Sequence, residues 1–149
     1  MVCFFGHRDA SMKNQEKIFE TIQYLVEQKG ENIFYVGTHG SFDRMVYNAL
    51  KKAKERYAQI RYYVVLSYLP SGKKDECYYK PEETIYPEGL EIHPKRVAII
   101  YRNQWMIKQS KYAVVYVCNS IGNSAKMIKY SEKQGCEIIN LGIEDENIN

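Results

Sequence analysis

The chain has 149 residues, which suits a single domain, and its 45% hydrophobic and 26% charged residues are typical of a globular protein. The net charge of +3 is small and lysines are interleaved with glutamates, so a nucleic-acid partner is not expected. No apolar run approaches the roughly 20 residues that span a bilayer, and no basic segment precedes the first apolar run as in a signal peptide. We therefore expect one cytoplasmic domain over residues 1–149, without a membrane partner.

Strands and helices are predicted to alternate along the chain. Val2 to Phe5 form a short apolar run that ends at Gly6, as in a buried strand. The expected strands cover residues 2–5, 32–37, 60–66, 112–118 and 137–141. The expected helices lie between Ser11 and Gly30, from about Ser41, over residues 97–108 and over residues 125–134. Each helix therefore connects two successive strands, except where the chain makes a longer excursion.

That excursion covers about residues 70–95. It contains all four prolines of the chain, several charges and little periodicity, which predicts a long loop. Within it, residues 82–87 are candidates for an extended segment, and Tyr78, Tyr79 and Tyr86 are candidates to stack on a base.

The near-continuous apolar character of the strands favours a parallel sheet that is covered on both faces. We therefore predict an α/β protein with a three-layer Rossmann-like fold and a mostly parallel five-stranded sheet. Right-handed crossovers place the carboxyl ends of all parallel strands at one edge, where such sheets bind ligands.

Three polar turns are expected at this edge, and they supply the candidate ligand-binding residues. Helix N-termini in these turns offer free backbone N–H groups to a phosphate. The candidates are Gly6, His7 and Arg8 in the first turn; Gly37, Thr38, His39, Gly40, Ser41, Asp43 and Arg44 in the second; and Asn119, Ser120, Gly122, Asn123 and Ser124 in the third.

The second turn gives the strongest signal. Gly37 and Gly40 allow a positive φ and close approach of a ligand to the backbone, and Ser41 can donate to an anion. Asp43 could pair with Arg44 or accept ribose hydroxyls, or it could be an ordinary first-turn acid. His39 could act as an acid or base, or only as a hydrogen-bond donor.

The four cysteines, Cys3, Cys77, Cys118 and Cys136, form no C-x-x-C pair and have no histidine at metal-ligand spacing. Cys3 and Cys118 lie in apolar runs and are expected to be small buried side chains. The pattern is typical of a reducing compartment, and neither a metal nor a cofactor is predicted.

Several motifs together resemble the SLOG superfamily. They are Phe5-Gly6-His7-Arg8, the segment from Gly37 to Asp43, the segment from Tyr101 to Ile107, and the strand 112–118 with its polar turn. This group includes the DUF1273 and YpsA-like proteins and, more distantly, the LOG phosphoribohydrolases and the DprA proteins. The resemblance implies a Rossmann-like fold that binds nucleotides or NAD-derived signals, and it implies that Arg102 and Asn103 face the site.

Three functions follow as hypotheses. The first is a module that senses or sequesters a nucleotide-derived ligand of the ADP-ribose or NAD-derived class. The second is an N-glycoside hydrolase or a nucleoside deoxyribosyltransferase, with Asp43 and His39 as candidate catalytic residues. The third is a partner-binding domain without a site, since a fold alone does not define a function. The oligomeric state stays open, with apolar residues near Trp105 as a candidate surface for a homo-oligomer.

Overall fold

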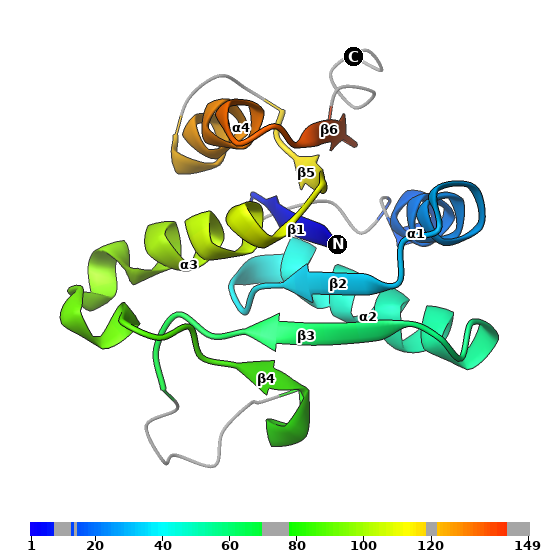
Figure 1. The fold of residues 1–149 in the computed structure, drawn as a ribbon, viewed down its shortest axis with the longest axis horizontal. Helices are drawn as coiled ribbons and strands as arrows, with labels where there is room; N and C mark the ends of the chain where they lie inside the picture. The colour runs from blue at the N-terminus through cyan, green and yellow to red at the C-terminus, as the bar shows by residue number, and fades with distance from the viewer. Residues whose placement is uncertain (8–12, 14, 70–77, 119–121, 143–149) are drawn as a thin grey trace.

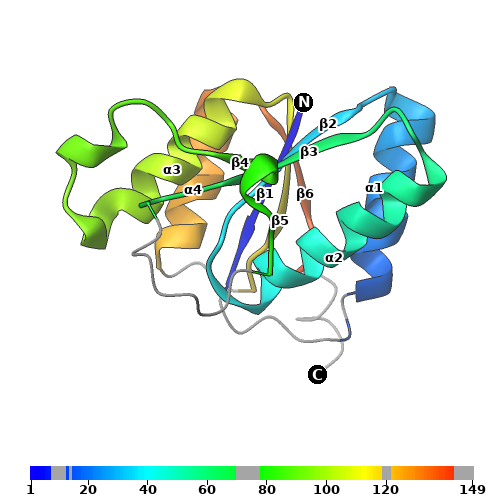
Figure 2. The same ribbon diagram turned by 90° about the horizontal axis from the view of Figure 1, so that it is seen from below.

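The computed structural model describes residues 1–7, 13, 15–69, 78–118 and 122–142, and it has a six-stranded sheet between two layers of helices (Figure 1). The elements are β1 (Val2–Gly6), α1 (Gln15–Lys29), β2 (Ile33–Val36), α2 (Gly40–Arg56), β3 (Arg61–Val65), η2 (Pro81–Glu83), β4 (Thr84–Ile85), η3 (Leu90–Ile92), α3 (Lys95–Gln109), β5 (Tyr112–Tyr116), α4 (Asn123–Lys133) and β6 (Glu137–Asn140). Seen from a perpendicular direction, α1 and α2 cover one face of the sheet, and α3 and α4 cover the other (Figure 2). The predicted three-layer α/β architecture is confirmed.

The strand order places a topological switch point beside β1. The order is β4-β3-β2-β1-β5-β6, and every paired strand is parallel to its neighbour. The chain moves outward from β1 through β2 and β3 to β4, and then returns to the other side of β1 to form β5. The connections that leave β1 and β5 therefore diverge to opposite faces, which opens a crevice at the carboxyl ends of these two strands.

The prediction of five strands is wrong, because β4 adds a sixth strand within the expected loop. Thr84 and Ile85 pair with Val64 and Val65 of β3. A strand of two residues carries no periodicity, and only its pairing with β3 defines it. With η2 and η3, β4 gives regular structure to much of the region from 78 to 95, and residues 70–77 lie outside the part that the structure describes.

The core has two halves because successive strand residues face opposite sides of the sheet. Val2 and Phe4 of β1 pack toward α1 and α2, whereas Cys3 and Phe5 pack toward α3 and α4. These residues are all buried, which explains why the run has no polar alternation. Helix α3 begins at Lys95, two residues before the predicted start, and follows Pro94.

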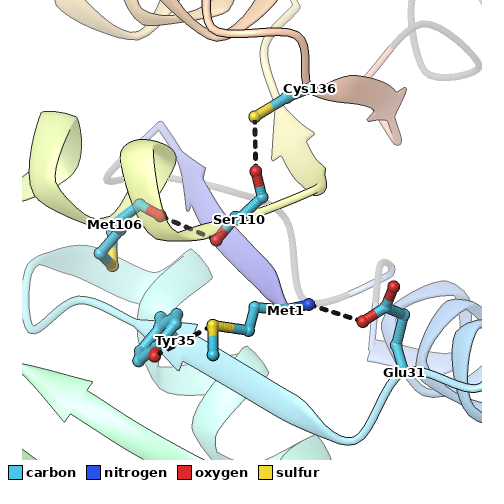
Figure 3. Close-up of polar contacts among 6 residues, drawn as sticks. All are labelled: Met1, Glu31, Tyr35, Met106, Ser110 and Cys136. Carbon is cyan, nitrogen blue, oxygen red and sulfur yellow. Dashed lines mark hydrogen bonds and ion pairs between the residues drawn. The ribbon is translucent and has the colours of Figure 1, made fainter.

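The amino ends of the strands lie at the edge opposite the crevice, and local contacts tie them together (Figure 3). The terminal ammonium of Met1 pairs with Glu31 at 2.6 Å, and the Tyr35 hydroxyl donates to the Met1 sulfur at 3.5 Å. The Cys136 thiol donates to the carbonyl of Ser110 at 3.2 Å. This edge holds its polar groups in contacts between neighbouring segments.

Among the described residues, no helix is both long and apolar enough to cross a membrane. Cys3 and Cys136 are buried free thiols, Cys118 is only half-buried, and Cys77 lies outside the described residues. Burial raises the pKa of the Cys3 thiol to about 12. Cys3 is therefore a small buried side chain, as expected.

Candidate functional site

A cleft of about 340 Å³ lies at the carboxyl end of β1, between the turns that follow β2 and β5, where they meet α3 and the start of α4. Its position is the topological switch point that the strand order defines. The residues that line it are Phe5, Gly6, His7, His39, Asp43, Arg96, Ile99, Ile100, Arg102, Asn103, Gly122, Asn123 and Ser124. The expected edge of the sheet therefore carries a cleft, and side chains from separate turns converge on it.

Arg102 forms part of the wall of this cleft although its side chain is almost completely buried, at 2% exposure. Its Nη1 donates to the carbonyl of Val65 at the end of β3, at 3.0 Å, and its Nε donates to Oδ1 of Asn103 at 2.8 Å. A guanidinium has five N–H groups, and the other three have no hydrogen bond within the described part of the chain. Arg102 can therefore donate to a ligand from a fixed position.

Gly37 provides the space for this guanidinium. A Cβ atom at Gly37 would lie 2.5 Å from Nη1 and 2.6 Å from Cζ of Arg102. Gly37 is not among the glycines with a positive φ, whereas Gly40, the first residue of α2, has a φ of 91°. Gly37 is therefore required by the space that the Arg102 side chain occupies, and Gly40 by its backbone conformation.

Asp43 is 5% exposed, lines the cleft and interacts electrostatically with Arg102. Its Oδ2 accepts the backbone N–H of His39 at 2.8 Å, which closes the turn before α2. Burial raises the pKa of Asp43 to about 6, although Arg102 and the His39 N–H favour the charged form. Burial also lowers the pKa of Arg102, and Asp43 opposes that shift.

The alternative that Asp43 pairs with Arg44 is not realised. Arg44 is exposed and does not line the cleft, and its guanidinium lies over the ring of Tyr78 at 5.3 Å from the centroid. Tyr78 and Tyr79 pack against each other and against the core on the α2 side. They are therefore not positioned as a stacking surface in the cleft.

The imidazoles of His7 and His39 are both held by contacts. Nε2 of His7 accepts the backbone N–H of Cys118 at 3.0 Å, which assigns the proton of the neutral ring to Nδ1. Nδ1 of His39 lies 3.1 Å from the Thr38 hydroxyl, and its Nε2 lies 3.4 Å from the Tyr68 hydroxyl. His7 and His39 line the cleft. Thr38 does not line it, and its hydroxyl contacts the His39 ring.

The third turn brings the start of α4 to the cleft. Gly122 has a φ of 100°, a conformation that favours glycine, and Asn123 and Ser124 open the helix. Gly6, at the end of β1, also lines the cleft, and a Cβ there would lie 2.9 Å from the ring of Phe42. Arg8, Asn119 and Ser120 lie outside the described residues, and Ser41 is half-buried in α2 without lining the cleft.

Sequence reasoning missed Phe5, Arg96, Ile99 and Ile100, which also line the cleft. The last three follow from Asn103 by helical periodicity, because residues three or four apart share one face of a helix. The signal was therefore present once Asn103 was a candidate, but Arg96 precedes the predicted helix start at 97.

A larger groove of about 610 Å³ lies between α1 and α2, away from the strand ends. Its lining residues are Gln15, Glu16, Phe19, Glu20, Gln23, Met45, Asn48, Ala49 and Lys52. Size alone would favour it, but none of the converging turns contributes to it. We therefore take the smaller cleft as the functional candidate.

Within the described ranges, no group of three or more His, Cys, Asp or Glu residues could hold a metal ion.

Trp105 is half-buried, and its ring packs edge-on against Tyr35 at 5.4 Å between centroids. Among known proteins, no family model matches this chain, and no curated protein matches it significantly.

Gly37→Ala should displace the Arg102 guanidinium from its hydrogen bond with Val65. We expect the free energy of unfolding to fall by about 1–3 kcal/mol in urea titrations, as for other overpacked sites. In an Arg102→Met background, the same alanine should cost much less, because the clashing group is gone. Equal costs in the two backgrounds would contradict this account of Gly37.

Asp43 should make stability depend on pH. Because its pKa is raised from 3.8 to about 6 in the folded state, the folded state binds more protons between these values. The stability of the wild type relative to Asp43→Asn should therefore fall by about 1–3 kcal/mol as the pH rises from 4 to 7. Urea unfolding of both proteins across this range measures this difference in stability. A difference that does not change with pH would contradict the raised pKa of Asp43 in the folded state.

Proposed function

We propose that the cleft binds a nucleotide or nucleotide-derived ligand of the ADP-ribose or NAD-derived class, and that the protein senses or sequesters this ligand. The observation that carries the proposal is the position of a polar, cationic cleft at the topological switch point, with a buried arginine in its wall. Parallel α/β sheets bind their ligands at this point. A binding module needs only this preorganised cleft.

The cleft offers several donors to phosphate oxygens. Arg102 is fixed by its two hydrogen bonds, and Arg96 lies on the same helix at the rim of the cleft. Asn123 and Ser124 add the N-terminus of α4, where backbone N–H groups and the helix dipole favour an anion. A diphosphate group could therefore be held between α3 and α4.

Other groups suit sugar hydroxyls. Oδ1 of Asn103 accepts from Arg102, so its amide N–H groups are left as donors. Nδ1 of His7 carries the proton of the neutral ring, and the Asp43 carboxyl group can accept from a hydroxyl. This mixture of donors and one carboxyl group supports a ribose phosphate more than a simple inorganic anion.

Membership of the SLOG superfamily is part of the same proposal. The motifs that carry the resemblance contribute Gly6, His7, His39, Asp43, Arg102 and Asn103 to one cleft. A protein of this kind would work in the cytoplasm and meet its ligand there. Assembly into a homo-oligomer stays a proposal for which size-exclusion chromatography with light scattering is the direct test.

A thermal-shift screen against ADP-ribose, NAD and cyclic ADP-ribose tests the proposal. A ligand at one hundred times its dissociation constant should stabilise the protein by about 2.7 kcal/mol, or about 5–10 °C. Arg96→Gln should weaken binding about tenfold, because it removes a charge-assisted donor. Arg61→Gln is the matched control, since Arg61 is an exposed arginine at the amino end of β3. No shift with any of these compounds would contradict the proposal.

An N-glycoside hydrolase or a nucleoside deoxyribosyltransferase is the alternative, and the Asp43 carboxyl group favours it. A carboxyl group in a cleft with a pKa raised to about 6 is suited to acid–base work or to stabilising an oxocarbenium-like centre. The backbone N–H of His39 fixes one oxygen of this carboxyl group. His39 is a less direct acid, because Thr38 and Tyr68 contact its ring nitrogens.

Chromatography of the ligand mixtures separates the two functions. An enzyme should release a free base from the wild type, and Asp43→Asn should abolish that turnover. A binding module should release no product, and Asp43→Asn should weaken binding by about tenfold or less, since the amide still accepts from His39. Product formation that survives Asp43→Asn would exclude Asp43 as the catalytic residue.

A further inference from the structure

Tyr68 lies just beyond the end of β3 and adjoins the cleft through His39. Its hydroxyl is 3.4 Å from Nε2 of His39, and the two rings meet edge-on with centroids 5.7 Å apart. His39 lines the cleft, so Tyr68 contacts a residue of the cleft wall without being in the wall itself. The Tyr68 side chain is 43% exposed, and the adjacent Leu69 is 63% exposed.

The lining of the cleft accounts for the polar part of a nucleotide but not for its base. Apart from the two imidazoles, Phe5 is the aromatic residue in the lining, and it is 3% exposed. Bases are commonly bound by stacking on an accessible aromatic ring, which contributes to affinity for any base. Along the described residues at this rim, Tyr68 provides such a ring beside the cleft.

The first residue of α3 contacts the same ring. The ammonium of Lys95 lies over the Tyr68 ring at 5.5 Å from the centroid, and the next residue, Arg96, lines the cleft. The cation–π contact shows that the ring attracts a cationic or electron-poor group. Because such a contact is weak at an exposed site, a base can replace Lys95, which then remains close to the phosphates.

We propose that Tyr68 is the base-stacking platform of this cleft, so that the ligand lies with its phosphate at Arg102 and its base on the Tyr68 ring. The inference rests on the proposed function, since it assumes that a nucleotide occupies the cleft. It assigns Tyr68 as a binding residue outside the three turns. It also requires a ligand with an intact base.

Calorimetric titrations with ADP-ribose and with ribose 5-phosphate test this assignment. Tyr68→Ala should weaken ADP-ribose binding about 5- to 150-fold, the range that loss of one stacked base produces, and leave ribose 5-phosphate binding unchanged. Tyr68→Phe should bind both ligands as the wild type does, because it keeps the ring and loses only the hydroxyl near His39. Tyr101→Ala is the matched control, because Tyr101 is 39% exposed and stacks on His93 instead.

Tyr68→Trp adds a direct readout. Its indole fluorescence should be quenched by ADP-ribose and not by ribose 5-phosphate, against the half-buried Trp105 as background.

Equal ADP-ribose affinity in the wild type and Tyr68→Ala would overturn the assignment and leave the proposed function intact. Equal losses in Tyr68→Phe and Tyr68→Ala would also overturn it, because Tyr68 would then act through His39. If the wild type binds neither ligand and the thermal-shift screen finds no binding of NAD or cyclic ADP-ribose, the proposed function fails together with the platform.

Discussion

The candidate site depends on the burial of one charged side chain, Arg102, at the carboxyl edge of the sheet. Moving a guanidinium out of water is costly unless hydrogen bonds and an opposite charge compensate for it. Here the carbonyl of Val65, the amide of Asn103 and the nearby carboxyl group of Asp43 provide that compensation. Gly37 provides the volume. Arg102 comes from α3 and Asp43 from α2, so this interaction connects the two helical layers across the end of the sheet.

A buried charge pair is a poor way to stabilise a fold, because apolar side chains of the same size often do better. Both Arg102 and Asp43 line a cleft, which favours a role in recognition. Arg102 is held before any ligand arrives, so that binding would not have to order it. The contacts of His7 with Cys118 and of His39 with Asp43 have the same effect at the ends of β1 and β2.

The carboxyl edge and the opposite edge of the sheet differ in how they use their polar groups. At the amino ends of the strands, Met1 is paired with Glu31 and Cys136 with Ser110 within the protein. At the carboxyl ends, Arg102 and Asn103 line a cleft and keep N–H groups that have no hydrogen bond within the described part of the chain. This asymmetry follows from the parallel topology, which gathers all helix N-termini at one edge.

The sequence by itself determined the alternation of strands and helices, the buried faces of α1 and α2, and the edge at which polar turns meet, because these depend on local periodicity and on turn residues. Only the tertiary structure decided the rest. Strand β4 exists through its pairing with β3. Asp43 interacts electrostatically with Arg102 of another layer and does not pair with the adjacent Arg44. Tyr68, rather than Tyr78, lies beside the cleft. Each of these depends on segments that are distant in the chain, and no local pattern encodes such contacts.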